Sequence, residues 1–456
     1  MTRTAPRLFA LLLLGLLLSA CVGREARPDL ARLYERMSLD PDQPPVIVIH
    51  GLMGSTLVDA KTGKQFWPGS LGTVAFSTYT DLARMTAETD GGPHLVPGDL
   101  FYGLAGVDYY GALIDTLEKV GRFERGTPGQ PVGSHRRRYY VLLYDWRKDN
   151  IDAVRKLHAL IDQIRDDYGN PNLRVDIVAH SNGGLIANYY LRYGPQDVLD
   201  QHEFYPWNEG SQRIRRMVLL GTPNLGAVSS LERLMRGFRI ALRTIPVEVL
   251  ATFATPFEAL PHPLVQSIFD QQGKPYDLDI YDPKMWRDNQ WSVYSEEVMA
   301  RVRDSAPTPE AGARAVADLQ ARFETNLRRA QRFQWALTAP FHNEGVSIAV
   351  FGGDCTLTEG RAVFEHDHGA PWLAFHPREV TDGAKGVDFD RLMLEPGDGL
   401  VTRASQVSRE TLDPGQPRHE FNFFPTSQSF FLCETHDQLT TNVYFQNNLL
   451  YFLLSR

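Results

Sequence analysis

Residues 175–184 read VDIVAHSNGG, and this stretch decides the fold that we expect for the chain. The apolar residues before Ser181 predict a buried strand, and residues 183–193 predict a helix. Ser181 is therefore expected on a sharp turn between them. Such a turn needs small residues around the serine, because its strained backbone passes close to neighbouring elements while the hydroxyl stands clear of the sheet. Ala179 stands where glycine is usual, which is a mild replacement. The pattern is typical of a nucleophilic serine.

Strand and helix patterns alternate on both sides of this turn. Further strands are predicted at residues 45–49, 139–144, 216–221 and 347–351, and further helices at residues 151–168 and 438–454. Alternation of this kind indicates right-handed βαβ units. We therefore predict an α/β fold with a mainly parallel sheet flanked by helices.

The alternation stops between about Asn224 and His342. Helical patterns at residues 229–242 and 310–337 are separated here by proline-rich stretches, and we interpret the segment as an inserted, mainly helical cap or lid. Residues 45–223 and 343–456 then form the catalytic core. The most apolar part of the cap, residues 245–269, either faces lipid or packs the cap onto the core, and packing is the more common arrangement.

The first twenty residues have the pattern of a signal peptide. Arg3 and Arg7 precede the apolar run 8–18, which is too short to span a bilayer. The run closes with LSAC at residues 18–21, which looks like the lipobox of bacterial lipoproteins, where the cysteine is lipidated and becomes the mature N-terminus. An ordinary signal peptide with a chance cysteine is the alternative.

Lipidation of Cys21 predicts a protein held at a membrane surface of the bacterial cell envelope. Each buried methylene of an acyl chain contributes about 0.8 kcal/mol, so several chains hold a protein firmly. Val22, rather than aspartate, follows the cysteine, which by resemblance to this class suggests the outer membrane. The charged, proline-containing residues 21–44 are expected to act as a tether.

Composition and net charge restrict the kinds of partner that the chain could bind. With 43% hydrophobic and 22% charged residues the chain is globular, and a net charge of −8 argues against a nucleic-acid partner.

Cys355 and Cys433 are the cysteines that remain after Cys21. Because an exported protein meets an oxidising compartment, we predict a disulfide between them, with two separate buried thiols as the alternative.

A nucleophilic serine needs a histidine to take its proton and a carboxylate to orient that histidine. In α/β-hydrolases these partners follow in the order serine, acid, histidine. His436, just before the final predicted helix, fits the histidine. For the acid we choose Asp398, because Gly397 and Gly399 permit a tight turn that presents a carboxylate at a strand end. Asp354, directly after the strand 347–351, is its rival.

The oxyanion of an acyl-transfer intermediate needs two backbone donors. Leu52, in the turn HGLMG at residues 50–54, and Asn182, after the serine, occupy the expected places, although an ordinary strand-ending turn at Leu52 is the alternative. This chemistry requires no cofactor. The sequence also shows no closely spaced His or Cys set for zinc, so no metal site is predicted.

Four blocks of the sequence resemble the lecithin:cholesterol acyltransferase family, which includes lysosomal phospholipase A2. The blocks are residues 45–55, residues 144–147 with the helix to Tyr168 and Ser181, residues 220–226, and residues 397–405 with His436. The resemblance implies an α/β-hydrolase that transfers an acyl group from a lipid ester to Ser181 and then to water or an alcohol. It also favours Asp398 over Asp354. Residues 145–147, DWR, are expected to form a buried ion pair with an aromatic plug.

Departures from the family pattern at Thr222, Asn182 and Leu400 leave the acyl acceptor open. The stretches 63–129 and 224–342, which select the substrate, cannot be matched. Two other functions therefore remain: an esterase or thioesterase for non-lipid substrates, and a non-catalytic surface lipoprotein on a hydrolase scaffold.

Overall fold

A seven-stranded sheet forms the centre of the computed structural model, which describes residues 28–37, 43–69, 72, 77–83, 94–104, 106–133, 136–240, 243–367 and 369–455. The strand order is β19-β14-β10-β9-β1-β8-β7, and every neighbouring pair is parallel. The strands are β1 (Val46–Ile49), β7 (Glu124–Arg125), β8 (Arg138–Leu142), β9 (Val175–His180), β10 (Ile214–Leu220), β14 (Ser347–Gly353) and β19 (Gln428–Leu432). The sheet confirms the predicted α/β-hydrolase fold.

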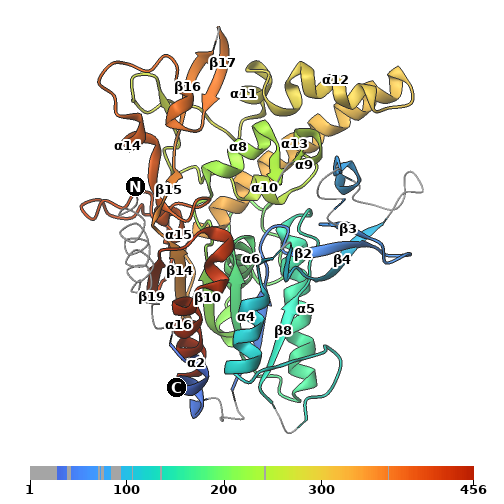
Figure 1. Ribbon diagram of the computed structural model, residues 1–456, viewed down its shortest axis with the longest axis vertical. Coiled ribbons are helices and arrows are strands. Elements are labelled where there is room, and N and C mark those ends of the chain that lie inside the picture. Colours follow the sequence, from blue (N-terminus) through green and yellow to red (C-terminus); the bar gives the residue numbers. More distant parts are fainter. Residues whose placement is uncertain are drawn as a thin grey trace, which may run out of the picture.

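Helices cover both faces of this sheet (Figure 1). Ile47 and Ile49 of β1 pack in one core cluster with α5 (Asn150–Asp167) and α6 (Asn182–Tyr193). Val46 and Val48 pack in another with α4 (Gly111–Asp115) and α16 (Val443–Leu454). Because both faces of β1 are buried, its sequence is continuously apolar rather than alternating.

The upper layer in Figure 1 corresponds only in part to the predicted cap of residues 224–342. One hydrophobic cluster joins α8 (Val228–Arg236), α10 (Thr255–Glu258), α11 (Pro283–Asp288) and α13 (Pro309–Thr338). The same cluster includes β16 (Ala362–Asp367) and β17 (Ala370–Ala374), and β13 (Ile268–Asp270) pairs with β16. Residues after 342, assigned by the sequence to the core, therefore also build this layer.

The upper layer differs from the sequence prediction in one helix and agrees with it in its apolar stretch. The predicted helix 229–242 ends early: α8 stops at Arg236, because Gly237 has a φ of 85°, and β11 (Phe238–Ile240) follows, paired with β12 (Arg243–Ile245). In the apolar stretch 245–269, the side chains of Leu250, Phe253 and Phe257 are buried. These residues pack inside the protein, which is the more common of the two arrangements that we considered.

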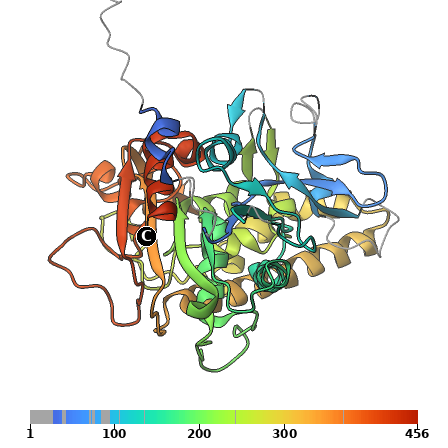
Figure 2. The ribbon, with the colours of Figure 1, turned by 90° about the horizontal axis from the view of Figure 1, so that it is seen from below.

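The N-terminal part of the described chain packs against the C-terminal helix. The helix α2 (Leu30–Tyr34) lies within the predicted tether, and the hydroxyl of Tyr34 donates to the carbonyl of Asn447 on α16 over 2.6 Å. Figure 2 shows α2 beside the C-terminal elements. Cys21 and the predicted signal peptide lie outside the described residues. No helix in the ranges described above has the length and apolarity needed to cross a bilayer.

Candidate active site

Ser181 occupies the turn between β9 and α6, with φ 53° and ψ −123°, a strained conformation for a residue with a side chain. Its backbone N–H donates to the carbonyl of Leu220 over 2.8 Å. A Cβ atom added to Gly183 would lie 2.6 Å from the carbonyl oxygen of Ile49. The turn therefore requires glycine at position 183, because it crosses directly over the end of β1.

Three side chains from distant parts of the sequence form one hydrogen-bonded row. The His436 Nε2 atom lies 3.0 Å from the Ser181 Oγ atom, and its Nδ1 atom lies 2.9 Å from an Asp398 carboxylate oxygen. The backbone N–H of His436 also donates to the carbonyl of Asp398 over 2.8 Å. With Asp398 ionised, His436 donates from Nδ1, which leaves Nε2 free to accept the Ser181 proton.

Hydrogen bonds from its own turn hold the carboxylate of Asp398 in place. One oxygen accepts hydrogen bonds from the backbone N–H groups of Leu400 and Val401, at 3.0 and 2.8 Å. The other accepts from the Gln406 side chain at 3.2 Å. This turn thus fixes the position of the carboxylate beside His436.

The electrostatics of His436 follow from its neighbours. Burial alone would lower the pKa of His436, but the charge and hydrogen bond of Asp398 outweigh it, and the pKa is raised above the ordinary histidine value. Because its pKa is raised, His436 is a stronger base than an ordinary histidine side chain.

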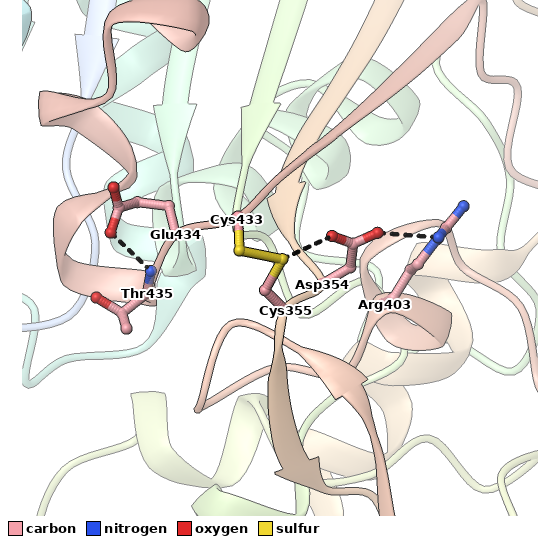
Figure 3. The surroundings of a disulfide bond; sticks show 6 residues. All are labelled: Asp354, Cys355, Arg403, Cys433, Glu434 and Thr435. Atoms are coloured by element: carbon pink, nitrogen blue, oxygen red, sulfur yellow. Dashed lines mark hydrogen bonds and ion pairs between the residues drawn. A yellow bond between two sulfur atoms is a disulfide. The ribbon is translucent and has the colours of Figure 1, made fainter. Parts of the chain in front are cut away.

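Asp354, the rival acid, is engaged elsewhere. Its carboxylate lies 3.0 Å from the guanidinium of Arg403 (Figure 3). The ring of His436 is instead hydrogen-bonded to Asp398. Next to Asp354, Cys355 and Cys433 form a disulfide with a Cα–Cα distance of 4.9 Å. The disulfide joins the chain after β14 to the chain after β19, three residues before His436. It therefore ties the histidine loop to the sheet.

Leu52 and Asn182 both line the cavity into which Ser181 opens. The side chain of Asn182 makes a reciprocal amide pair with Asn150, at 3.0 and 2.8 Å, and donates to the Tyr144 hydroxyl at 3.2 Å. These contacts hold the start of α6, where the Asn182 backbone N–H lies. Asn150 could not be singled out from the sequence, because its partner is 32 residues away.

A second network links the turn at residues 50–54 to the nucleophile turn. The backbone N–H of Gly51 donates to the Tyr110 hydroxyl over 2.8 Å, and this hydroxyl lies 2.8 Å from the Nδ1 atom of His180. Burial lowers the pKa of His180 to about 3, so its ring is neutral and can accept from Tyr110. Tyr110 thus bridges the two turns, and sequence reasoning missed it.

His50 is part of the packing beneath the nucleophile turn. Its ring is fully buried and stacks on Tyr144 at 4.2 Å between centroids, and its Nδ1 atom lies 2.8 Å from the carbonyl of Gly51. Burial lowers its pKa to about 4, which keeps it neutral. Nearby, Asp145 and Arg147 form a buried ion pair at 2.8 Å.

The cavity above Ser181 has a volume of about 350 Å³ and lies between the core and the upper layer. Most of its wall is apolar or aromatic, contributed by Leu52, Met53, Trp67, Phe101, Tyr109, Pro223, Phe238, Ile240, Leu250 and Leu400. Its polar lining includes Ser230, Arg233, Arg239 and Asp437. An apolar cavity with a few convergent polar groups suits an acyl chain attached to a polar head. In the described ranges of the chain, no cluster of three or more His, Cys, Asp or Glu side chains could hold a metal ion.

Comparison with known proteins gives a family match over part of the chain and a similar fold. Residues 132–305 match the family model described as lecithin:cholesterol acyltransferase. Lysosomal phospholipase A and acyltransferase from Bos taurus is 33% identical over 97 residues, which is 21% of this chain and only 20% of that protein. In the Tle4-Tli4 complex, one chain shares the fold, with a TM-score of 0.57 at 15% identity, covering 91% of this chain and 98% of that one. The alignment with the mature lipase BlEst2 of Bacillus licheniformis covers 90% of this chain and 90% of that one, at 12% identity and a TM-score of 0.32.

Proposed function

We propose that this chain, of which residues 132–305 match the lecithin:cholesterol acyltransferase family model, is a lipid ester hydrolase or acyltransferase with Ser181 as its nucleophile. The observation that carries the proposal is the row Ser181–His436–Asp398 at hydrogen-bond distances, opening into an apolar cavity. That combination of an activated hydroxyl and an acyl-sized apolar space has no evident structural purpose.

The proposed reaction proceeds through a covalent acyl-enzyme. The Ser181 Oγ atom attacks the ester carbonyl carbon while its proton passes to His436 Nε2. The backbone N–H groups of Leu52 and Asn182 donate to the resulting oxyanion. Collapse breaks the bond to the alcohol, which leaves with the proton from His436. Water or a second alcohol then attacks the acyl-enzyme, with His436 as base again, and releases an acid or a new ester together with free Ser181.

A choice of substrates separates this proposal from an esterase for soluble compounds. Purified protein is offered a phospholipid, a short-chain nitrophenyl ester and a peptide, with Ser181→Ala as the control. We expect the phospholipid to be cleaved with the higher kcat/KM, because the long acyl chain fills the apolar cavity. A preference for the short soluble ester alone would contradict the lipid assignment. Adding a sterol or diacylglycerol and analysing the products separates transfer from hydrolysis.

We also propose that the chain is anchored in the cell envelope through lipidated Cys21, on the strength of the sequence LSAC alone. Metabolic labelling with a fatty acid in a bacterial host is expected to mark the wild-type protein and not Cys21→Ser. Equal labelling of both would contradict the anchor. Enzymatic activity of the purified protein does not depend on this proposal.

A further inference from the structure

Arg233 stands out among the polar residues of the cavity above Ser181. It lies on α8, is partly buried, and lines the same cavity as Ser181 and His436. Its guanidinium group lies over the ring of Phe238, 4.3 Å from the centroid. The aromatic ring holds the guanidinium by a cation–π contact, and none of its five N–H donors has an acceptor among the residues that the structure describes.

No hydrogen bond or ion pair connects the side chain of Arg233 to any residue in the described parts of the chain. Burial lowers the pKa of Arg233, and the charges of Asp437 and Glu232 act in the opposite direction. The guanidinium nevertheless remains charged, because arginine side chains are not deprotonated in proteins. A partly desolvated cation without a bonded anion is costly unless a ligand completes the site.

The next arginine on the same helix shows how the protein neutralises such a charge elsewhere. Arg236 pairs with Glu379 at 2.7 Å and with Glu232 at 3.2 Å. It does not line the cavity. The contrast between two arginines one turn apart indicates that the protein provides an anion for the structural one and leaves Arg233 available to the cavity.

We propose that Arg233 binds an anionic group of the ester substrate, a phosphate or a carboxylate, and thereby selects anionic over neutral esters. This inference rests on the proposed function of Ser181. Ser230 lies three residues earlier on α8 and also lines the cavity, so its hydroxyl and the guanidinium share one face of the helix. A planar guanidinium is well suited to an oxyanion, because it can donate two parallel hydrogen bonds.

Asp437 is the group that opposes this binding. Its carboxylate also lines the cavity and attracts Arg233. The two side chains do not approach within ion-pair distance in the described structure, so an incoming anion can take the donors of Arg233. Arg239, which lines the same cavity, adds a second positive charge on that side.

The test compares three glycerolipids with identical acyl chains, carried in the same neutral detergent micelles. Phosphatidylglycerol carries a phosphate, a diacylglycerol hemisuccinate carries a carboxylate, and diacylglycerol is neutral. A hydrogen bond to a charged group contributes about 1.5–3 kcal/mol, so we expect Arg233→Gln to lower kcat/KM for the preferred anionic lipid by about tenfold to a hundredfold. Activity on diacylglycerol should stay within about twofold. Whichever anionic lipid shows the loss identifies the group.

Arg243→Gln is the matched control, since Arg243 is exposed on β12, outside the cavity, and its loss changes the net charge equally. It should leave the ratio of anionic to neutral activity unchanged. An equal loss on all three lipids in Arg233→Gln, or no loss, would overturn the role of Arg233. If the wild-type protein is inactive on all three lipids, the proposed function is overturned instead.

A second measurement uses only the wild-type protein and guards against misfolding of the variant. A fluorophosphonate probe labels an activated serine. Dodecyl phosphate should slow the labelling of Ser181 at least tenfold more effectively than dodecanol, which has the same chain without the charge. Equal protection by the two compounds would also overturn the proposal.

Discussion

At the scale of single residues, the pair of His436 and Asp398 makes activity depend on pH. The base must be neutral to accept the Ser181 proton. Because the pKa of His436 is raised, kcat/KM is expected to fall as pH drops through a value above that of an ordinary histidine. Activity is fully present above that pKa. A pH profile of kcat/KM with a soluble ester measures it.

Replacing Asp398 tests the origin of this shift. Asp398→Asn removes the charge that raises the pKa of His436, so the acidic limb should move to lower pH, while kcat should fall by roughly 10⁴ as the histidine loses its orientation. Asp354→Asn is the matched control and should keep the wild-type profile, because Asp354 pairs with Arg403. A larger loss of kcat in Asp354→Asn than in Asp398→Asn would show that Asp354, and not Asp398, is the acid.

Asn150 offers a second test at this scale, as a positioning residue. Asn150→Ala removes the amide pair of Asn182, so the backbone N–H that we assign to the oxyanion is less well oriented. We expect kcat to fall by up to about a hundredfold with KM nearly unchanged, since the loss of a donor costs about 10²–10³. The exposed Asn172→Ala is the control. A rise in KM with constant kcat would show that Asn150 acts on substrate binding instead.

At the scale of elements, the β9–α6 turn needs small residues because it crosses over the end of β1. In Gly183→Ala the new Cβ would meet the Ile49 carbonyl at 2.6 Å, and a strand backbone in the centre of the sheet cannot yield easily. Overpacking of this kind costs about 1–3 kcal/mol, so the free energy of unfolding should fall by that amount in urea titrations. Gly133→Ala, where an added Cβ meets nothing within 4 Å, should be unaffected. Equal stability of the two variants would contradict this packing.

The disulfide joins two further elements, and its removal tests how far it supports them. Cys355 and Cys433 are 78 residues apart, and closing a loop of that length contributes roughly 4 kcal/mol in the chain-entropy model. The double variant Cys355→Ser, Cys433→Ser should therefore unfold at a lower urea concentration and should also lose activity, because His436 follows the bridge closely. An unchanged urea midpoint for the reduced or substituted protein would be evidence against this role.

At the scale of the whole molecule, sequence patterns predicted the sheet better than the upper layer. The strands β1, β9, β10 and β14 are recognisable because burial on both faces gives each a short run of consecutive apolar residues. The long helix α13 matches the predicted residues 310–337 to within one residue at each end. Such elements are determined by local periodicity, which the sequence displays directly.

Features that depend on pairing between distant segments were not predictable in this way. The strand β16 pairs with β13, about ninety residues earlier, and β2 (Ser55–Asp59) pairs with β4 (Leu95–Leu100) beyond an intervening stretch. The same holds for the site. Ser181, His436 and Asp398 could be chosen by residue type and order, whereas Arg233 and Tyr110 become visible only when the fold brings them to the cavity and the turns.

The proposed catalysis depends on the reactivity of the Ser181 hydroxyl, which can be measured directly. The purified protein is treated with a fluorophosphonate probe, and the modified peptide is identified by mass spectrometry. We predict stoichiometric labelling on Ser181, none in Ser181→Ala, and much slower labelling in His436→Ala with an unchanged thermal midpoint. Absence of labelling in the folded wild-type protein, or labelling that persists in Ser181→Ala, would contradict the account.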